Sequence, residues 1–125
     1  MWKSVFGTME YGKNGIKIRE QWDEVLNIPF FPCTNMGYDK TPRFPQLGKA
    51  HTVPYNKSPQ SFATFLAKAK QYVDSRPNQP KLLTINAWNE WVEDNYLLPC
   101  MKHGFSYLEA VKEVMEGKYD RYIYR

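Results

Sequence analysis

A nearly continuous apolar run, LLTINAW at residues 82–88, is the feature that most restricts how this chain can fold. Runs of this kind are typical of strands covered on both faces, as strands of parallel sheets are. The run follows the turn-forming segment RPNQP at 76–80, which ends the preceding helical pattern. The sequence therefore predicts a helix, a turn and then a strand at about 81–88 that is buried on both sides.

Residues 59–74 carry the clearest helix signal in the chain. Ser58 and Pro59 provide an N-cap and a proline for the first helical position. The spacing of the next apolar residues places them on one helical face. Similar spacing predicts helices at about 17–27 and 104–116. The apolar positions of the 59–74 helix are Phe62, Phe65, Leu66, Ala69, Tyr72 and Val73.

The order of the expected elements points to an α/β fold. The segment IPFFPC at 28–33 predicts a strand at about 28–34, although its prolines remove ladder donors. Helices and strands then alternate, which is the order of βα units that build a parallel sheet. A complete (β/α)8 TIM barrel needs about 250 residues, and the chain has 125. We therefore expect residues 1–125 to form a single partial domain of such a barrel.

Composition and charge exclude several function classes. The 17 Lys and Arg residues outnumber the 13 Asp and Glu residues by four, and they are scattered, which argues against nucleic acid or an anionic membrane as partner. No apolar stretch is long enough for a membrane span, and Met1 begins no signal-type segment, so the compartment stays open. No phosphate loop, dinucleotide fingerprint or metal-ligand spacing occurs, so we expect no cofactor and no metal. Cys33 and Cys100 are expected to be buried free thiols.

The segment NAWNEWVEDNY at 86–96 contains three carboxylates, three amides and three aromatic residues directly after the predicted strand. In parallel α/β proteins, sites are built where the strands end. Glu90 and Glu93 are three residues apart, so a turn-like backbone brings both side chains to one side. Two close carboxylates favour opposite protonation states, and cleavage of glycosidic bonds uses such a pair. The alternative is that both are solvated loop charges and that the tryptophans are core residues.

Four blocks of the chain together resemble one known family. They are MGYDKTPR at 36–43, NAWNEWVE at 86–93, YLLP at 96–99 and GFSYLEA at 104–110. In this order they resemble the C-terminal signature of the glycoside hydrolase family 99-like proteins, also called WbsX-like glycosyltransferases. The resemblance covers roughly residues 28–115. It implies the C-terminal part of a (β/α)8 TIM barrel, with the last two βα units present.

The same resemblance implies roles for individual side chains. Glu90 would be the base that removes the proton of a sugar 2-hydroxyl group, and Glu93 the general acid that protonates the leaving oxygen. The reaction implied is retaining cleavage within α-mannosidic chains through a 1,2-anhydro sugar. Asp39 and Arg43 would bind sugar hydroxyl groups or pair with each other to brace their loop. The other candidate substrate-binding residues are Tyr38, Asn86, Trp88, Asn89, Trp91 and Tyr96.

The chain departs from the family pattern at Leu98 and Cys100, where members carry carboxylates. The expected substrate is an oligosaccharide or polysaccharide, and a missing N-terminal barrel portion or self-association would complete the enzyme. One alternative is a non-catalytic carbohydrate-binding or interaction fragment. Another is a glycosyltransferase of polysaccharide biosynthesis of the O-antigen type, which needs an activated donor such as a nucleotide sugar.

Overall fold

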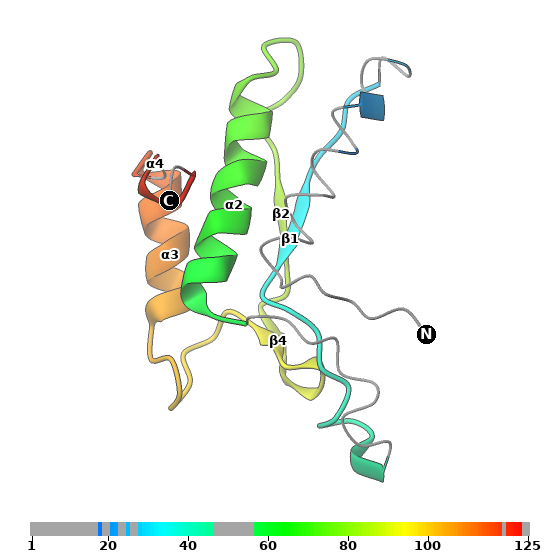
Figure 1. Ribbon diagram of the computed structural model, residues 1–125, viewed down its shortest axis with the longest axis vertical. Helices are drawn as coiled ribbons and strands as arrows, with labels where there is room; N and C mark the ends of the chain where they lie inside the picture. Colours follow the sequence, from blue (N-terminus) through cyan, green and yellow to red (C-terminus); the bar gives the residue numbers. More distant parts are fainter. Residues whose placement is uncertain are drawn as a thin grey trace.

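The computed structural model describes residues 28–46, 57–118 and 120–123, together with Ile18, Gln21, Trp22 and Val25. These four residues are helical, as predicted for 17–27. The rest of that predicted helix lies outside the described residues. The fold is mixed α/β, with a small parallel sheet on one side of a helix pair (Figure 1).

The sheet and the two main helices agree in type with the sequence prediction. Along the chain the elements are β1 (Cys33–Asn35), α2 (Pro59–Asp74), β2 (Thr84–Asn86), β3 (Asn89–Glu90), the 3-10 helix η2 (Trp91–Glu93), β4 (Asn95–Tyr96), α3 (Ser106–Met115) and α4 (Asp120–Ile123). The α2 helix spans the predicted range, and α3 lies within its predicted range. The β3, η2, β4 and α4 elements are two to four residues long, too short to produce a periodic pattern that sequence analysis can detect.

The β1 and β2 strands pair in parallel, with Thr34 opposite Ile85. The predicted parallel arrangement is therefore confirmed, although both strands are shorter than predicted. The expectation that the 81–88 strand is covered on both faces is wrong, because Thr84 and Asn86 are exposed and Leu82 is 51% exposed. The reason is that the described helices cover one face of this sheet (Figure 1).

The α2 helix begins at a well-formed N-cap. Ser58 has an extended backbone, and its Oγ accepts a 3.0 Å hydrogen bond from the backbone N–H of Ser61. All six residues of the stretch 62–67 are buried, so apolar partners must surround this part of the helix. Figure 1 shows why: α2 lies between the β1–β2 sheet and α3.

The hydrophobic core lies mainly between α2 and α3. The rings of Phe62 and Tyr107 meet edge to face with their centroids 5.7 Å apart. Leu66 and Val114 are completely buried in the same cluster, and so is Met36 from the loop after β1. This loop is therefore anchored to the helix pair, which fixes the residues that follow it.

The two cysteines are free but not buried as predicted. Cys33 is exposed and Cys100 is half-buried. Cys33 lies at the start of β1 and faces away from the helices, because its neighbour Thr34 takes the buried side. Cys100 begins a surface turn that Gly104 closes in a left-handed conformation with φ of 53°.

No helix in the described parts of the chain is long and apolar enough to cross a bilayer.

Candidate functional site

The candidate site lies at the ends of the two parallel strands. The β1 strand runs into the loop at 36–46, and β2 runs into the segment at 87–94 that contains β3 and η2. Because β1 and β2 are parallel neighbours, these two segments leave the sheet at the same edge.

Two hydrogen bonds join the loop after β1 to the chain after β2. The backbone N–H of Asp39 donates to the carbonyl oxygen of Glu93 at 2.9 Å. The backbone N–H of Met36 donates to Oδ1 of Asn95 at 3.1 Å, and Asn95 is only 2% exposed. Sequence analysis assigned no position to Asn95, because a buried amide and an exposed one look the same in a polar loop. Asn95 is buried beside Met36, so its side chain helps to hold the loop after β1 in position.

Arg43 lies between Glu90 and Glu93. One terminal nitrogen of its guanidinium is 3.1 Å from Oε1 of Glu90, and the other is 3.1 Å from Oε1 of Glu93. All three side chains are partly exposed, Glu93 the least. The planar guanidinium offers separate donors in a fixed fork, so it can hold two carboxylates at once. The structure thus brings together three residues that the sequence places in two distant loops.

Local backbone geometry places both carboxylates on the same cation. Glu90 ends β3, and the single turn of η2 returns the chain so that Glu93 faces the same guanidinium. Asp94 then leaves the turn in a left-handed conformation with φ of 49°. On the other loop, the backbone N–H of Arg43 donates to the carbonyl of Lys40 at 3.0 Å in a turn. The Asp39 carboxylate accepts the N–H of Thr41 at 2.7 Å rather than bracing Arg43.

Aromatic residues lie next to the two carboxylates in the sequence. Trp88 is 55% exposed and Trp91 is 44% exposed, so the alternative that both are core residues is wrong. Trp91 stacks on Tyr96, with ring centroids 3.9 Å apart and planes inclined by 26°. Exposed indole rings beside carboxylates offer apolar faces to the C–H groups of a sugar.

The remaining predicted residues lie around this centre. Asn86 ends β2 and Asn89 begins β3, and both are exposed. The peptide bond between Asn86 and Ala87 is cis. Tyr38 is half-buried on the Arg43 loop, and the Lys40 ammonium lies 5.5 Å from the centroid of its ring.

Lys57 is a second residue that sequence analysis missed. Its ammonium forms an ion pair with Oδ1 of Asp94 at 2.7 Å and lies 5.0 Å from the centroid of the Tyr96 ring. Burial lowers the pKa of Lys57, while the contact with Asp94 opposes that change. Burial also raises the pKa of Tyr96 to about 12, with a further contribution from its hydrogen bond to Cys100. Lysine in a loop is too common for its position alone to give a signal.

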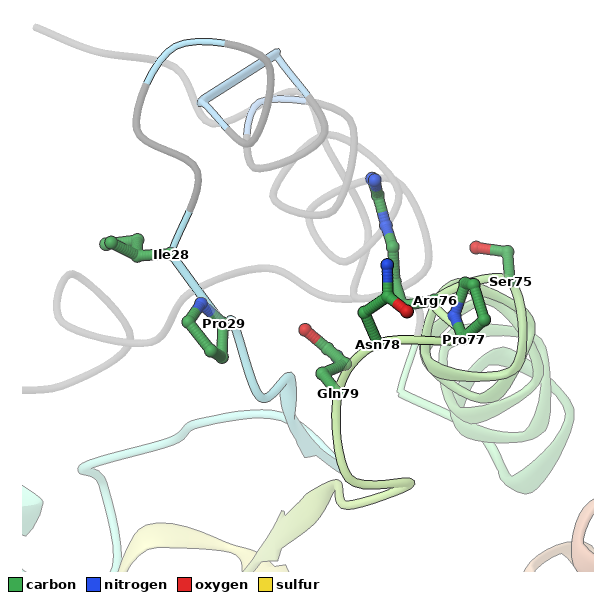
Figure 2. Close-up of a pocket in the computed structure, with 7 residues that line it drawn as sticks. All are labelled: Ile28, Pro29, Ser75, Arg76, Pro77, Asn78 and Gln79. Atoms are coloured by element: carbon green, nitrogen blue, oxygen red, sulfur yellow. The ribbon is translucent and has the colours of Figure 1, made fainter.

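A pocket of about 310 Å³ lies away from this site (Figure 2). It is formed by the segment before β1, at Ile28 and Pro29, and by the turn after α2 at 75–79. There Nε2 of Gln79 donates a hydrogen bond to the carbonyl oxygen of Phe30 at 3.0 Å, and Oε1 of Gln79 accepts one from the backbone N–H of Phe30 at 3.3 Å. The pocket thus lies near the N-terminal ends of β1 and β2, whereas the two carboxylates follow the C-terminal end of β2. Within the residues that the structure describes, no group of three metal-ligating side chains occurs.

Comparison with known proteins decides the family. A family model described as Glycosyltransferase WbsX matches residues 6–111. The chain belongs to this family. The WbsX match includes both loops of the candidate site.

The chain also matches two curated proteins. The chain is 30% identical over 86 residues to "Uncharacterized protein WxcX" of Xanthomonas campestris pv. campestris, in strain B100 and in strain ATCC 33913. The aligned part is 68% of this chain and 12% of each relative. The chain thus spans a small part of the relatives that it matches. No solved structure matches it significantly.

Proposed function

We propose that Glu90 and Glu93 form the acid–base pair of an enzyme acting on glycosidic bonds in an oligosaccharide or polysaccharide. The observation that carries this proposal is the position of Arg43, whose guanidinium lies 3.1 Å from both carboxylates. All three residues follow the C-terminal ends of the two parallel strands. Arg43 contacts both carboxyl groups at once, so both are held within reach of one sugar ring. Exposed Trp88 and Trp91 supply the apolar surface beside them.

In the proposed reaction, Glu90 takes the proton of the sugar 2-hydroxyl group. The freed oxygen attacks the anomeric carbon as the glycosidic C–O bond breaks, which forms a 1,2-anhydro sugar. Glu93 gives its proton to the leaving oxygen and then takes a proton from the water that attacks the anomeric carbon. Glu90 returns its proton to the 2-oxygen as the anhydro ring opens. Such proton transfers between placed groups typically contribute 10²–10⁴-fold to the rate.

We further propose that the described units are the C-terminal βα units of a (β/α)8 TIM barrel and that residues 1–125 belong to one partial domain. Parallel pairing of β1 with β2 supports this proposal, as does a helix layer on one face of the sheet. The other face carries exposed Thr84 and Asn86. Further strands, from another part of a longer protein or from a second copy, would complete the barrel and with it the activity.

The test replaces each carboxylate by its amide, in Glu90→Gln and Glu93→Gln. The probe is a set of α-linked mannooligosaccharides labelled at the reducing end, and the readouts are chain shortening by chromatography and binding by calorimetry. We expect turnover to fall about 10²–10⁴-fold while binding is kept. The control Glu109→Gln, an exposed position on α3, should change neither. Unchanged turnover in both amide variants would overturn the acid–base assignment.

The same experiment separates the enzyme from a binding module. Once a longer protein or a second copy completes the barrel, a module that only binds sugar would still show no chain shortening, and both amide variants would bind as the unmodified protein does. The exposed indole rings of Trp88 and Trp91 are the observation in favour of that reading.

The description of the matched family, a glycosyltransferase, motivates a third reading, in which the protein transfers a sugar. A transferase of polysaccharide assembly needs an activated donor, so the test adds a nucleoside diphosphate sugar to an acceptor oligosaccharide. A longer product that forms only with the donor would indicate transfer. Shortening of the acceptor in the absence of the donor would indicate hydrolysis.

A further inference from the structure

The residue before the N-cap of α2 reaches the turn that follows β2. Lys57 directly precedes Ser58, the N-cap, so the start of its side chain is fixed by a helix that is packed into the core. Its ammonium forms an ion pair with Oδ1 of Asp94 at 2.7 Å and donates a hydrogen bond to the backbone carbonyl oxygen of the same residue. The Lys57 side chain is only 16% exposed, so salt screens this pair less than a fully exposed one. Lys57 therefore holds both the side chain and the main chain of Asp94.

Asp94 is the corner at which the turn bearing Glu93 ends. Its backbone is left-handed, with φ of 49°, and its N–H donates to the carbonyl oxygen of Trp91 at 3.1 Å. A residue other than glycine is uncommon in this conformation and persists there when its surroundings hold it. The two contacts from Lys57 provide such a hold. Because Glu93 is the preceding residue, a shift of this corner would move the Glu93 side chain.

Glu93 is thus held from two directions. From the loop after β1, the Arg43 guanidinium lies 3.1 Å from Oε1 of Glu93, and the backbone N–H of Asp39 donates to the Glu93 carbonyl oxygen at 2.9 Å. From the start of α2, Lys57 holds the next residue, Asp94. Arg43 contacts the end of the Glu93 side chain, whereas Lys57 supports the backbone from which that side chain projects.

The Lys57 ammonium also contacts the aromatic stack. It lies 5.0 Å from the centroid of the Tyr96 ring, within the range of a cation–π contact. The Tyr96 ring stacks on Trp91 with centroids 3.9 Å apart. Trp91 begins η2 and Tyr96 ends β4, so the stack joins the two ends of the same short segment. One half-buried cation therefore supports both the corner after Glu93 and the aromatic stack.

We propose that Lys57 is a positioning residue, which holds the turn at 91–94 so that the Glu93 carboxyl group stays beside Arg43 and can reach the leaving oxygen. Its expected effect on turnover rests on the proposed function, whereas its effect on the placement of Glu93 does not. A displaced proton donor slows the chemical step more than it weakens contact with the rest of the sugar. Loss of Lys57 should therefore lower kcat rather than raise KM.

The first test compares two lysine ion pairs of the same length in the active protein with its barrel complete. Lys57→Met removes the partner of Asp94, and the control Lys70→Met removes the partner of Asp74, also at 2.7 Å and similarly exposed. With labelled α-linked mannooligosaccharides, we expect Lys57→Met to lower kcat at least about tenfold and to change KM less than about threefold. Lys70→Met should change neither. An equal kcat in the two variants, where Glu93→Gln does lower kcat, would overturn the positioning role.

The second test needs no activity. The side-chain carboxyl groups of glutamate are labelled with carbon-13, and the NMR resonance of Glu93 is assigned by its absence in Glu93→Gln. We expect Lys57→Met to shift this resonance toward its position in Arg43→Met, because the contact with Arg43 loosens, while Lys70→Met leaves it in place. The resonance of Glu109, exposed on α3, should not move in either lysine variant.

The two tests separate failure of this proposal from failure of the proposed function. An unmoved Glu93 resonance in Lys57→Met would overturn the positioning role. A moved resonance together with unchanged turnover in Glu93→Gln would support the placement by Lys57 and overturn the acid–base assignment instead. Circular dichroism checks that each variant is folded. Lys57→Gln, which is neutral but keeps a hydrogen-bond donor, provides the same comparison if Lys57→Met does not fold.

Discussion

The backbone N–H of Asp39 donates a 2.9 Å hydrogen bond to the carbonyl oxygen of Glu93. This bond ties the loop after β1 to the turn after β2 at the residue proposed as general acid. It uses main-chain atoms, so side-chain substitutions in either loop leave the bond itself available. The positions of the two carboxylates then depend chiefly on Arg43.

Arg43 should matter for activity far more than for stability. Arg43→Met removes the cation between Glu90 and Glu93, and we expect turnover on labelled oligosaccharides to fall at least tenfold. Because the pair is partly exposed, the free energy of unfolding in urea should change by only about 0.2–1 kcal/mol. Arg43→Lys should not restore turnover, since an ammonium cannot offer a planar fork to two carboxylates. Full activity of Arg43→Lys would show that charge alone suffices.

Asn95 should contribute to stability through one hydrogen bond. In Asn95→Ala the buried N–H of Met36 loses its acceptor, which typically costs about 1–3 kcal/mol. Urea denaturation of this variant should therefore show a lower midpoint. Asn89→Ala, at an exposed amide six residues earlier in the chain, should change the free energy of unfolding by less than about 0.5 kcal/mol. Equal stability of the two variants would contradict the prediction.

The core between α2 and α3 should be sensitive to cavities. Leu66 is completely buried, so Leu66→Ala should lower the free energy of unfolding by about 2–5 kcal/mol. Met101 is fully exposed, and Met101→Ala should be neutral to within about 0.5 kcal/mol. Thermal and urea denaturation followed by circular dichroism measure both. A loss below about 1 kcal/mol for Leu66→Ala would contradict the complete burial of Leu66 in the core cluster.

Tyr96 should make the fold sensitive to alkaline pH. Its pKa is raised from 10.0 to about 12 in the folded protein, by burial first and then by its bond to Cys100. The folded state therefore keeps a proton that the unfolded chain loses, and this contribution to stability is complete below pH 10 and is lost as the pH rises toward 12. The urea midpoint should fall over that interval, and the fall should be smaller in Tyr96→Phe. Tyr107 and Tyr122, whose pKa values are also raised, keep part of the effect in the variant.

Several elements could be predicted because their signals are local. The α2 helix has its cap, its proline and its apolar face within 17 consecutive residues, Ser58 to Asp74, and the turn after it is rich in proline. The αβ order then predicted a parallel sheet, and β1 with β2 confirms it. The short hairpin β3–β4, between Asn89 and Tyr96, left no comparable pattern because a strand of two residues has no alternation to detect.

Sequence alone determined which residues could carry chemistry: two carboxylates three residues apart, with tryptophans beside them, directly after a strand. Only the tertiary structure decided how they are held. Arg43 reaches Glu90 across 47 residues, and Asn95 reaches Met36 across 59. Caps and helical faces depend on neighbours within a few residues, so the sequence displays them directly. An ion pair or a buried hydrogen bond between distant loops depends on the path of the whole chain, and the exposed face of β2 depends on which elements lie over it.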